Sequence, residues 1–416
     1  MDGDGGLSGY RACLDGQMEQ RAAWPADSPW LREAFAALPR DRFAPDRLWR
    51  WDGRAYVPVD RADDPSGWAA ELYSGVDTAA VTQLTGGRPS SSLSAPSVVA
   101  DMLDSLRVEP GHRVWEVGTG QGWTAALAAW RAGPGLVLST EVDEDLAAFA
   151  RARLAEAGLD AEVAAGNGTD GGVPGGGPVD RLHATYAVEA VPWSWVEAVH
   201  PGGRIVYPWG RLGYVALTVA DDGGAAHGWV HGLAQFMGDR TGPAQPSTGS
   251  AAYAQVCGGA EPEARRVLDR DPKALEDWHL RFALRVAVPD AVLFTEHGED
   301  GPLVMVHDGD RSWAGIRADA DGRPTLSQGG PRRIGDELMA AWDQWEDLGA
   351  SRPVRLRHHR HPALAVGLAG KPGPWSEVAD RTPATAAVHS VMTRDGSKEH
   401  RPGPRDLPQL TLMPGE

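Results

Sequence analysis

The sequence predicts an α/β protein built on a mostly parallel sheet with helices on both faces. Between residues 97 and 240, short apolar runs alternate with helical segments, the pattern of strands joined by crossover helices. One apolar run, "HRVWEVG", passes through a glycine-rich turn into the helical segment "WTAALAAWRA". The chain has 416 residues, which is too long for one ordinary core, so we expect more than one domain.

Each element of this region has a local signal. The segment "VVADMLDSL" places Val99, Met102, Leu103 and Leu106 on one helical face. "HRVWEVG" and "GLVLSTEV" are predicted as buried strands, and the second leads into the helix "DEDLAAFARARLAEAG", which Gly158 ends. "DRLHATYA" and "GGRIVYPW" are predicted as further strands of the same sheet.

Composition divides the chain into four expected parts. Residues 1–90 form a helical extension on the substrate side, and residues 91–240 form the α/β domain. Residues 251–370 form an α+β substrate-binding domain, and residues 371–416 a loosely ordered tail. In the third part "WHLRFALRVAVP", "AVLFTEH", "LVMVHDGDRSWAGIRA" and "VRLRHHRHPALAVGL" are predicted as strands, and "PRRIGDELMAAWDQWEDLGA" as a helix.

Charge and cysteine content exclude several classes of partner. The net charge of −17 argues against nucleic acid, because binding phosphates needs surplus Lys and Arg. No apolar run is long enough to span a bilayer and no leader pattern begins the chain, so we expect a cytoplasmic protein without a membrane partner. Cys13 and Cys257 are the only cysteines, which excludes a disulfide framework and a cysteine-based zinc site.

The stretch "VWEVGTGQGW" carries the clearest chemical signal. Its glycines, Gly118, Gly120 and Gly122, allow the backbone to turn tightly and a ligand to approach closely. Glu116 precedes them, and Glu141 ends the next strand, where ribose hydroxyls need an acceptor. The E-x-G-x-G form is the one that S-adenosylmethionine-dependent methyltransferases use. An ordinary strand-to-helix turn and a nicotinamide dinucleotide site are the alternatives.

Five stretches in order carry a family resemblance. They are "RDRFAP", "SLSAP", "VWEVGTGQGW", "GNG" and "VEAVPWSWVEAVHPGGRIVYPWG". Through them residues 40–240 resemble the protein-L-isoaspartate O-methyltransferases. The resemblance implies a doubly wound, Rossmann-like class I methyltransferase fold with S-adenosyl-L-methionine as cofactor.

The resemblance also implies roles for single residues. Ser94 occupies the position of the family's serine beside the reacting carboxylate, and Ser92 that of a second substrate contact. From the residues alone, a serine before Pro96 is as readily a helix cap. Asn167 stands where the family has Asp. The cofactor-binding residues implied are Glu116, Gly118, Thr119, Gly120, Gly122, Glu141, Val142, Asn167 and Gly168.

Three further stretches suggest a specialised substrate. "YSGVDTAAVTQ", "FMGDR" and "QGGPRRIGDELMAAWDQW" resemble long methyltransferases found with ribosomally made, modified peptides. The resemblance implies esterification of one Asp in a lanthipeptide or graspetide, after which the ester closes to a succinimide (aspartimide). Repair of L-isoaspartyl residues and a non-catalytic S-adenosylmethionine-binding module are the alternatives.

The expected partner is a cyclised precursor peptide or an isoaspartyl peptide, bound by a monomer. Arg357 and Arg360 suit an acidic peptide. They are interleaved with His358, His359 and His361, but no carboxylate or cysteine lies at ligand spacing. We therefore expect a basic binding surface there and no metal site.

Overall fold

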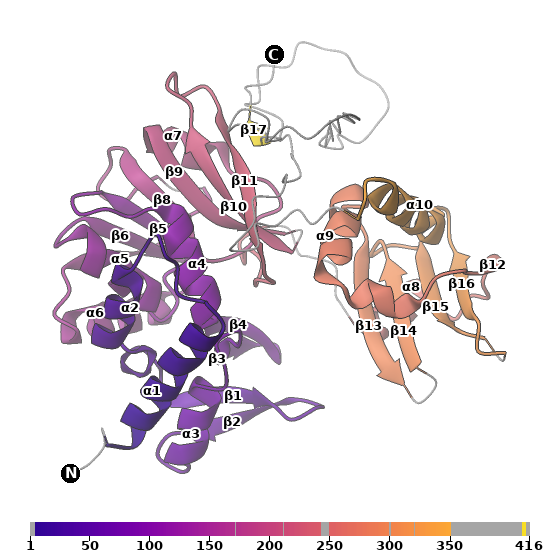
Figure 1. The fold of residues 1–416 in the computed structure, drawn as a ribbon, viewed down its shortest axis with the longest axis horizontal. Helices are drawn as coiled ribbons and strands as arrows, with labels where there is room; N and C mark the ends of the chain where they lie inside the picture. Colours follow the sequence, from indigo (N-terminus) through magenta and orange to yellow (C-terminus); the bar gives the residue numbers. More distant parts are fainter. Residues whose placement is uncertain are drawn as a thin grey trace. The chain divides into compact units, whose positions relative to one another are not determined.

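The computed structural model divides into two compact units (Figure 1). One contains residues 5–209 and 214–241 together with the strand 410–412. The other contains residues 210, 212, 213 and 242 and the described residues between 249 and 350. The structure describes residues 5–170, 172–210, 212–242, 249–298, 301–319, 321–350 and 410–412.

An eight-stranded sheet forms the centre of the first unit, in the order β17-β11-β10-β9-β8-β5-β6-β7. Neighbouring strands from β9 to β7 pair in parallel, which confirms the sequence prediction. Strand β5 lies between β6 and β8, so the chain order reverses there, and ligands of open α/β sheets bind at such a switch point. The strands are β5 (Val114–Val117), β6 (Val137–Glu141), β7 (Ala161–Ala165), β8 (Val179–Ala184), β9 (Val199–Trp209), β10 (Gly213–Val219), β11 (Ala226–Leu233) and β17 (Leu410–Leu412).

Helices at the expected positions cover this sheet. Helix α5 packs on β5 and β6 through a nearly continuous set of buried small and apolar side chains, which lets helix and sheet approach closely. Helix α4 packs on β8 and β9 with Val99, Met102, Leu103 and Leu106 buried, as its period predicted. The helices are α4 (Pro96–Leu106), α5 (Trp123–Ala132), α6 (Glu144–Glu156) and α7 (Trp193–Ala198).

The N-terminal extension contains helices and also a small sheet that the sequence analysis missed. Its strands have the order β2-β1-β3-β4 and pair antiparallel. Strands β3 and β4, "AVTQLT" and "RPSSSL", are polar, so they lack the apolar alternation that marks a strand. The elements are α1 (Gly5–Gln20), α2 (Trp30–Ala37), η1 (Arg40–Arg42), β1 (Arg47–Trp51), β2 (Tyr56–Asp60), α3 (Pro65–Leu72), β3 (Ala80–Thr85) and β4 (Arg88–Leu93).

The second unit has its own five-stranded antiparallel sheet and its own apolar core. Its strands follow the order β12-β16-β15-β14-β13. The elements are α8 (Ser250–Cys257), β12 (Ala264–Val267), η2 (Pro272–Glu276), α9 (Trp278–Ala287), β13 (Val292–Gly298), β14 (Gly301–His307), β15 (Trp313–Ala318), β16 (Pro324–Gly329) and α10 (Ile334–Asp347).

One strand prediction in this unit is wrong. "WHLRFALRVAVP" forms helix α9, although its apolar residues alternate as in a strand. The Asp277 side chain caps the helix by accepting from the backbone N–H groups of His279 and Leu280. Leu280, Leu284 and Val288 then enter the core one helical turn apart. The predicted strand "VRLRHHRHPALAVGL" and the tail up to residue 409 lie outside the described residues. Within the described part of the chain, no helix is long and apolar enough to cross a membrane.

Candidate active site

The glycine-rich turn follows β5 at the carboxyl edge of the parallel strands. Gly118, Gly120 and Gly122 have φ values of +90°, +52° and +84°, which side chains adopt only at a cost. A Cβ on Gly118 would lie 2.5 Å from Thr185 Oγ1 at the end of β8. Backbone conformation and close packing therefore both require glycine at the first position, as the sequence pattern predicted.

Glu141 ends β6 and faces this turn. Its side chain is 3% exposed. Oε2 accepts a hydrogen bond of 2.8 Å from the backbone N–H of Gly120. Oε1 accepts from the N–H of Asp143 at 3.1 Å and from Arg240 Nη2 at 2.8 Å. The ends of the two strands are thus joined through one buried carboxylate, where the sequence analysis expected an acceptor.

Arg240 and Asp143 are functional candidates that sequence reasoning missed. Arg240 Nη1 lies 3.6 Å from Asp143 Oδ2, and Asp143 also accepts a hydrogen bond of 2.9 Å from Gln83 Nε2. The signals were present, since Arg240 ends "FMGDR" and Asp143 follows Glu141 by two residues. Between the two carboxylates, the apolar side chain of Val142 is 43% exposed, which leaves an apolar surface beside the acceptor.

Glu116, in β5, and Thr119, within the turn, are both buried. Glu116 is 1% exposed and accepts a hydrogen bond of 2.6 Å from Ser139 Oγ, which lies 2.6 Å from Thr119 Oγ1. Burial raises the pKa of Glu116 to about 8, and burial lowers the pKa of the adjacent His183 to about 4. Glu116 and Thr119 are therefore linked through the Ser139 hydroxyl, which connects the turn to β6.

Asn167 and Gly168 follow β7 at the same edge of the sheet. The Asn167 amide accepts from the N–H of Thr169 at 2.9 Å and donates to Asp170 at 2.7 Å, so it shapes its own turn. A Cβ on Gly168 would lie 1.8 Å from Val117 Cγ1, at the end of β5. Gly168 is thus packed directly against β5, the strand that leads into the glycine-rich turn.

The serines occupy different positions along β4. Ser91 is buried, and its hydroxyl lies 3.6 Å from a Cβ placed on Gly120, so it is the serine that the structure brings to the turn. Ser92 and Ser94 are half-buried. Sequence reasoning missed Ser91, because the polar strand β4 was not predicted.

Ser94 stands at the junction of β4 and α4. The residue at the cap position is Ala95, with no side-chain cap, so the helix-cap interpretation of Ser94 is wrong. The Ser94 carbonyl accepts from Arg40 Nη2 at 3.3 Å. Within the described residues its hydroxyl makes no hydrogen bond, so this group is not engaged by the protein there.

Two predicted substrate contacts cannot be placed. Arg357 and Arg360 lie outside the described residues. In the part of the chain that the structure describes, no group of three or more His, Cys, Asp or Glu side chains is arranged to hold a metal ion.

The residues that meet at this edge fit S-adenosylmethionine. Glu141 offers a buried carboxylate to ribose hydroxyls, and Val142 offers an apolar surface to a base. The three glycines of the turn carry no side chains, so a ligand can approach the backbone there closely. These are contacts that a nucleoside carrying a charged side chain requires.

Comparisons with known proteins point to one family. A family model described as Protein-L-isoaspartate(D-aspartate) O-methyltransferase (PCMT) matches residues 73–225. The protein-L-isoaspartate O-methyltransferase of Methanopyrus kandleri is 37% identical over 183 residues, which are 43% of this chain and 69% of that protein. The Thermococcus onnurineus protein of the same name is 39% identical over 182 residues, 43% of this chain and 70% of its own length.

A solved structure titled protein-L-isoaspartate O-methyltransferase covers 82% of this chain and 93% of its own, at 18% identity and a TM-score of 0.44. That structural likeness is too weak to carry an argument. The sequence relatives carry it, because each is more than a third identical over more than two thirds of its own length. On this evidence the chain belongs to the protein-L-isoaspartate O-methyltransferase family.

Proposed function

We propose that this protein transfers a methyl group from S-adenosylmethionine to the free carboxylate of an isoaspartyl residue in a peptide, with Ser94 orienting that carboxylate. The observation that supports it best is the link between Glu141 and Gly120, which joins the two motifs of the cofactor site at the strand switch point. Membership of the family favours this enzyme over a non-catalytic binding module.

The reaction depends on aligning the carboxylate oxygen with the methyl group and needs no strong base. A carboxyl group with a pKa near ~4 is already ionised at neutral pH. S-adenosylmethionine supplies a methyl group on a positively charged sulfonium sulfur. The carboxylate oxygen forms a bond to the methyl carbon as the carbon–sulfur bond breaks, and no proton moves. The hydroxyl of Ser94 donates to the other carboxylate oxygen, which fixes the direction of attack.

The number of hydrogen bonds that the Glu141 carboxylate can accept determines how Arg240 affects cofactor binding. A carboxylate has about four acceptor positions. The backbone N–H of Gly120, the backbone N–H of Asp143 and Arg240 take three of them, including both on Oε1. A ribose presents two hydroxyls, so both can reach Glu141 only when one donor leaves Oε1. The side chain of Arg240 moves more readily than the backbone N–H of Asp143, so Arg240 is the donor that we expect to leave. Arg240 therefore competes with the cofactor for its acceptor.

The experiment compares two serines of the same stretch. Methyl transfer from labelled S-adenosylmethionine to an isoaspartyl peptide is measured for the wild type, Ser94→Ala and Ser97→Ala. The Ser97 hydroxyl is used by Asp77, at 2.7 Å, so this variant controls for a lost hydroxyl. We expect Ser94→Ala to lower kcat with unchanged affinity for S-adenosylhomocysteine. Equal losses in both variants, or none in Ser94→Ala, would remove Ser94 from the active site.

A second candidate function rests on the second unit. Its five-stranded sheet and separate core lie beyond residues 73–225, the stretch that matches the family model. A separate domain can hold the rest of a substrate and raise the effective concentration of one carboxylate. The candidate is methylation of one Asp in a cyclised, ribosomally made peptide, followed by closure to a succinimide.

The two candidates predict different substrate preferences for the full-length protein. An isoaspartyl peptide, an Asp-containing peptide cyclised through its side chains, and the linear form of that peptide are offered in equal amounts. Preference for the isoaspartyl peptide supports the repair-type reaction, which the named relatives favour. Esterification of the cyclised peptide ahead of both others supports the tailoring reaction.

A further inference from the structure

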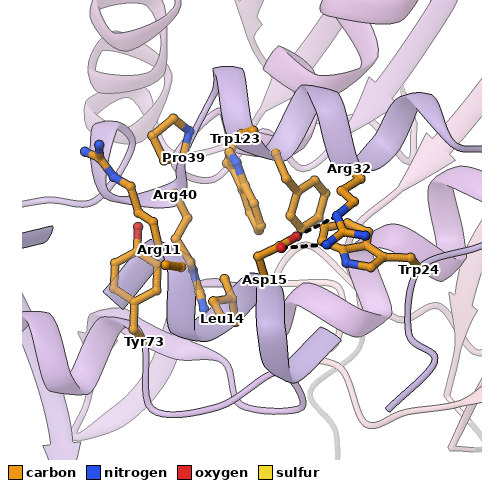
Figure 2. Close-up of a pocket in the computed structure, with 12 residues that line it drawn as sticks. Arg11, Leu14, Asp15, Trp24, Arg32, Pro39, Arg40, Tyr73 and Trp123 are labelled. Carbon is orange, nitrogen blue, oxygen red and sulfur yellow. Dashed lines mark hydrogen bonds and ion pairs between the residues drawn. The ribbon is translucent and has the colours of Figure 1, made fainter. Parts of the chain in front are cut away.

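A cavity lies in the first unit, and none of the residues of the candidate active site lines it. It has a volume of about 350 Å³ and lies between α1, α2 and the start of α5. That volume is within the range of small-molecule sites. Leu14, Trp24, Phe35 and Trp123 provide apolar and aromatic walls. Figure 2 shows Arg40 and Tyr73 on one side of it and Trp24 and Arg32 on the other.

Arg40 is a buried cation, and two of its nitrogen atoms have no hydrogen-bond acceptor among the described residues. It is 1% exposed. Nη2 donates to the carbonyls of Leu93, at 3.0 Å, and Ser94, at 3.3 Å, while Nε and Nη1 have no hydrogen-bond partner among the described residues. Burial lowers its pKa to about 10, which still leaves the guanidinium charged at neutral pH. A buried charge without a counter-ion is strongly unfavourable, so an anion bound beside Arg40 would stabilise this region.

The neighbouring carboxylate does not supply that anion. Asp41 accepts from Arg11 Nε at 2.8 Å and Nη2 at 2.7 Å, and it also accepts from the hydroxyl of Tyr73. The pKa of Asp41 is lowered, although its burial acts in the opposite direction, because Arg11 and Tyr73 donate to its ionised form. Asp41 is therefore satisfied by other partners, and no ion pair of Arg40 occurs in the described part of the chain.

A second buried donor lines the same cavity. Trp24 Nε1 is buried and has no hydrogen-bond partner within the described residues. Buried donors are nearly always satisfied, so two such side chains around one cavity point to a missing acceptor. Trp123 adds an aromatic face, with the guanidinium carbon of Arg40 5.5 Å from the ring centre.

The rim restricts the charge of a ligand. Arg32 and Asp15 form a paired contact there, with Nε–Oδ1 and Nη2–Oδ2 distances of 2.9 and 2.7 Å, drawn as dashed lines in Figure 2. This contact neutralises one arginine of the lining, and Asp41 neutralises Arg11. Arg40 alone remains, which suits one negative charge on an otherwise apolar molecule.

We propose that this cavity binds a small amphipathic carboxylate, such as an arylalkyl or branched aliphatic acid. Its carboxylate accepts from Arg40 once the guanidinium turns toward the cavity, because Nε and Nη1 are covered as they stand. Its apolar body lies among Trp24, Phe35 and Trp123. Because the same guanidinium holds the carbonyls of Leu93 and Ser94, the ligand would contact the support of the active-site segment. None of the cofactor and substrate residues named above lines the cavity, so its ligand would be a molecule other than the peptide substrate.

The test measures binding to the full-length protein by calorimetry. The probes are phenylacetate, 3-phenylpropionate and 4-methylpentanoate, with phenylacetamide as the uncharged control and inorganic phosphate as the hydrophilic anion. We expect at least one acid to bind with a Kd below about 5 mM, and the amide to bind at least about tenfold more weakly than phenylacetate. This readout is independent of methyl transfer.

Two neighbouring variants locate the binding. Ala36 is exposed but lines the cavity, whereas exposed Ala37 does not line it. Ala36→Phe fills the mouth and is expected to abolish binding of the acid, while Ala37→Phe retains it at the same melting temperature. Failure of all three acids to bind, equal binding of acid and amide, stronger binding of phosphate, or unchanged binding in Ala36→Phe would each overturn the proposal.

Discussion

Glu141 lies where two strand ends and a distant arginine meet, and in the proposed function it accepts from the ribose of the cofactor. Replacing it by alanine removes a buried charged acceptor, which costs about 1.5–3 kcal/mol, or about ten- to 150-fold in affinity. We expect that loss for S-adenosylhomocysteine, measured by calorimetry. Glu144→Ala, an exposed carboxylate in the next helix, is the control. Unchanged affinity in Glu141→Ala would show that this carboxylate does not hold the ribose.

Arg240 should act in the opposite direction to Glu141. Because it occupies Oε1 of the acceptor, Arg240→Ala is expected to tighten S-adenosylhomocysteine binding several-fold, and Arg240→Lys to fall between it and the wild type. Arg54→Ala, an exposed arginine in the β1–β2 turn, should leave affinity unchanged. Weaker binding in Arg240→Ala would mean that Arg240 supports the cofactor rather than competing with it.

At the level of single residues, the sequence predicted what local geometry determines. Gly118 and Glu141 follow from a strand, a turn and the next strand end, all within a short stretch. Arg240 and Ser91 could not be found that way, because their places depend on how segments far apart in sequence meet. Residue type alone could not show that Glu116 would be buried.

The pairing of β5 with β8 brings Glu116 opposite His183. The pKa of Glu116 in the folded chain, about 8, lies above the ordinary value of 4.5. The folded state therefore keeps a proton that the unfolded state gives up, and the stability contributed by Glu116 is full below pH 4.5 and is lost as the pH rises through about 8. His183 has a lowered pKa, about 4 against 6.5, so its contribution is lost as the pH falls below 6.5.

Glu116→Gln should remove the alkaline part of this dependence. From about pH 6.5 to about pH 8.5, the free energy of unfolding of the wild type is expected to fall relative to that of the variant. Urea denaturation at several pH values measures this difference. Glu162→Gln, exposed on β7, should follow the wild type. Parallel profiles for wild type and Glu116→Gln would show that Glu116 is ionised in the folded chain.

Two glycines in the loop after β7, Gly168 and Gly172, test whether this loop positions the glycine-rich turn. A Cβ on Gly168 would overlap Val117, whereas a Cβ on Gly172 meets nothing within 4 Å. Gly168→Ala is expected to lower the melting temperature and weaken S-adenosylhomocysteine binding, because the end of β5 must move. Gly172→Ala should change neither. Equal behaviour of the two variants would mean that this loop does not position the glycine-rich turn.

Element prediction succeeded where periodicity and packing agree. Strands β5, β6, β8 and β9 are apolar runs between helices, and the sheet buries them. The hairpin β3–β4 was missed because its side chains are polar and its pairing is stabilised by the rest of the unit. Helix α9 was predicted as a strand because its apolar residues alternate. The prediction overlooked Asp277, whose side chain caps the start of the helix.

At the scale of the whole molecule, the sequence predicted an α/β part and a separate α+β part. The core of the first unit extends from α1 into the central sheet, so the N-terminal helices belong to the methyltransferase unit. That continuity could not be read from the sequence, because the packing of α2 on α5 and of α1 on α3 depends on contacts between segments far apart in the chain. The second unit keeps its own core, and its contribution is substrate choice in the second candidate function.

The most direct test offers the full-length protein two peptides that differ only in one linkage, isoaspartyl or aspartyl, in one reaction with S-adenosylmethionine. Mass spectrometry follows a gain of about 14 Da, the methyl ester, and a later loss of about 32 Da as the neighbouring nitrogen closes the succinimide, a step driven by proximity. We predict that the isoaspartyl peptide gains the ester and the aspartyl peptide remains unchanged. Esterification of both at equal rates, or of neither, would contradict the account.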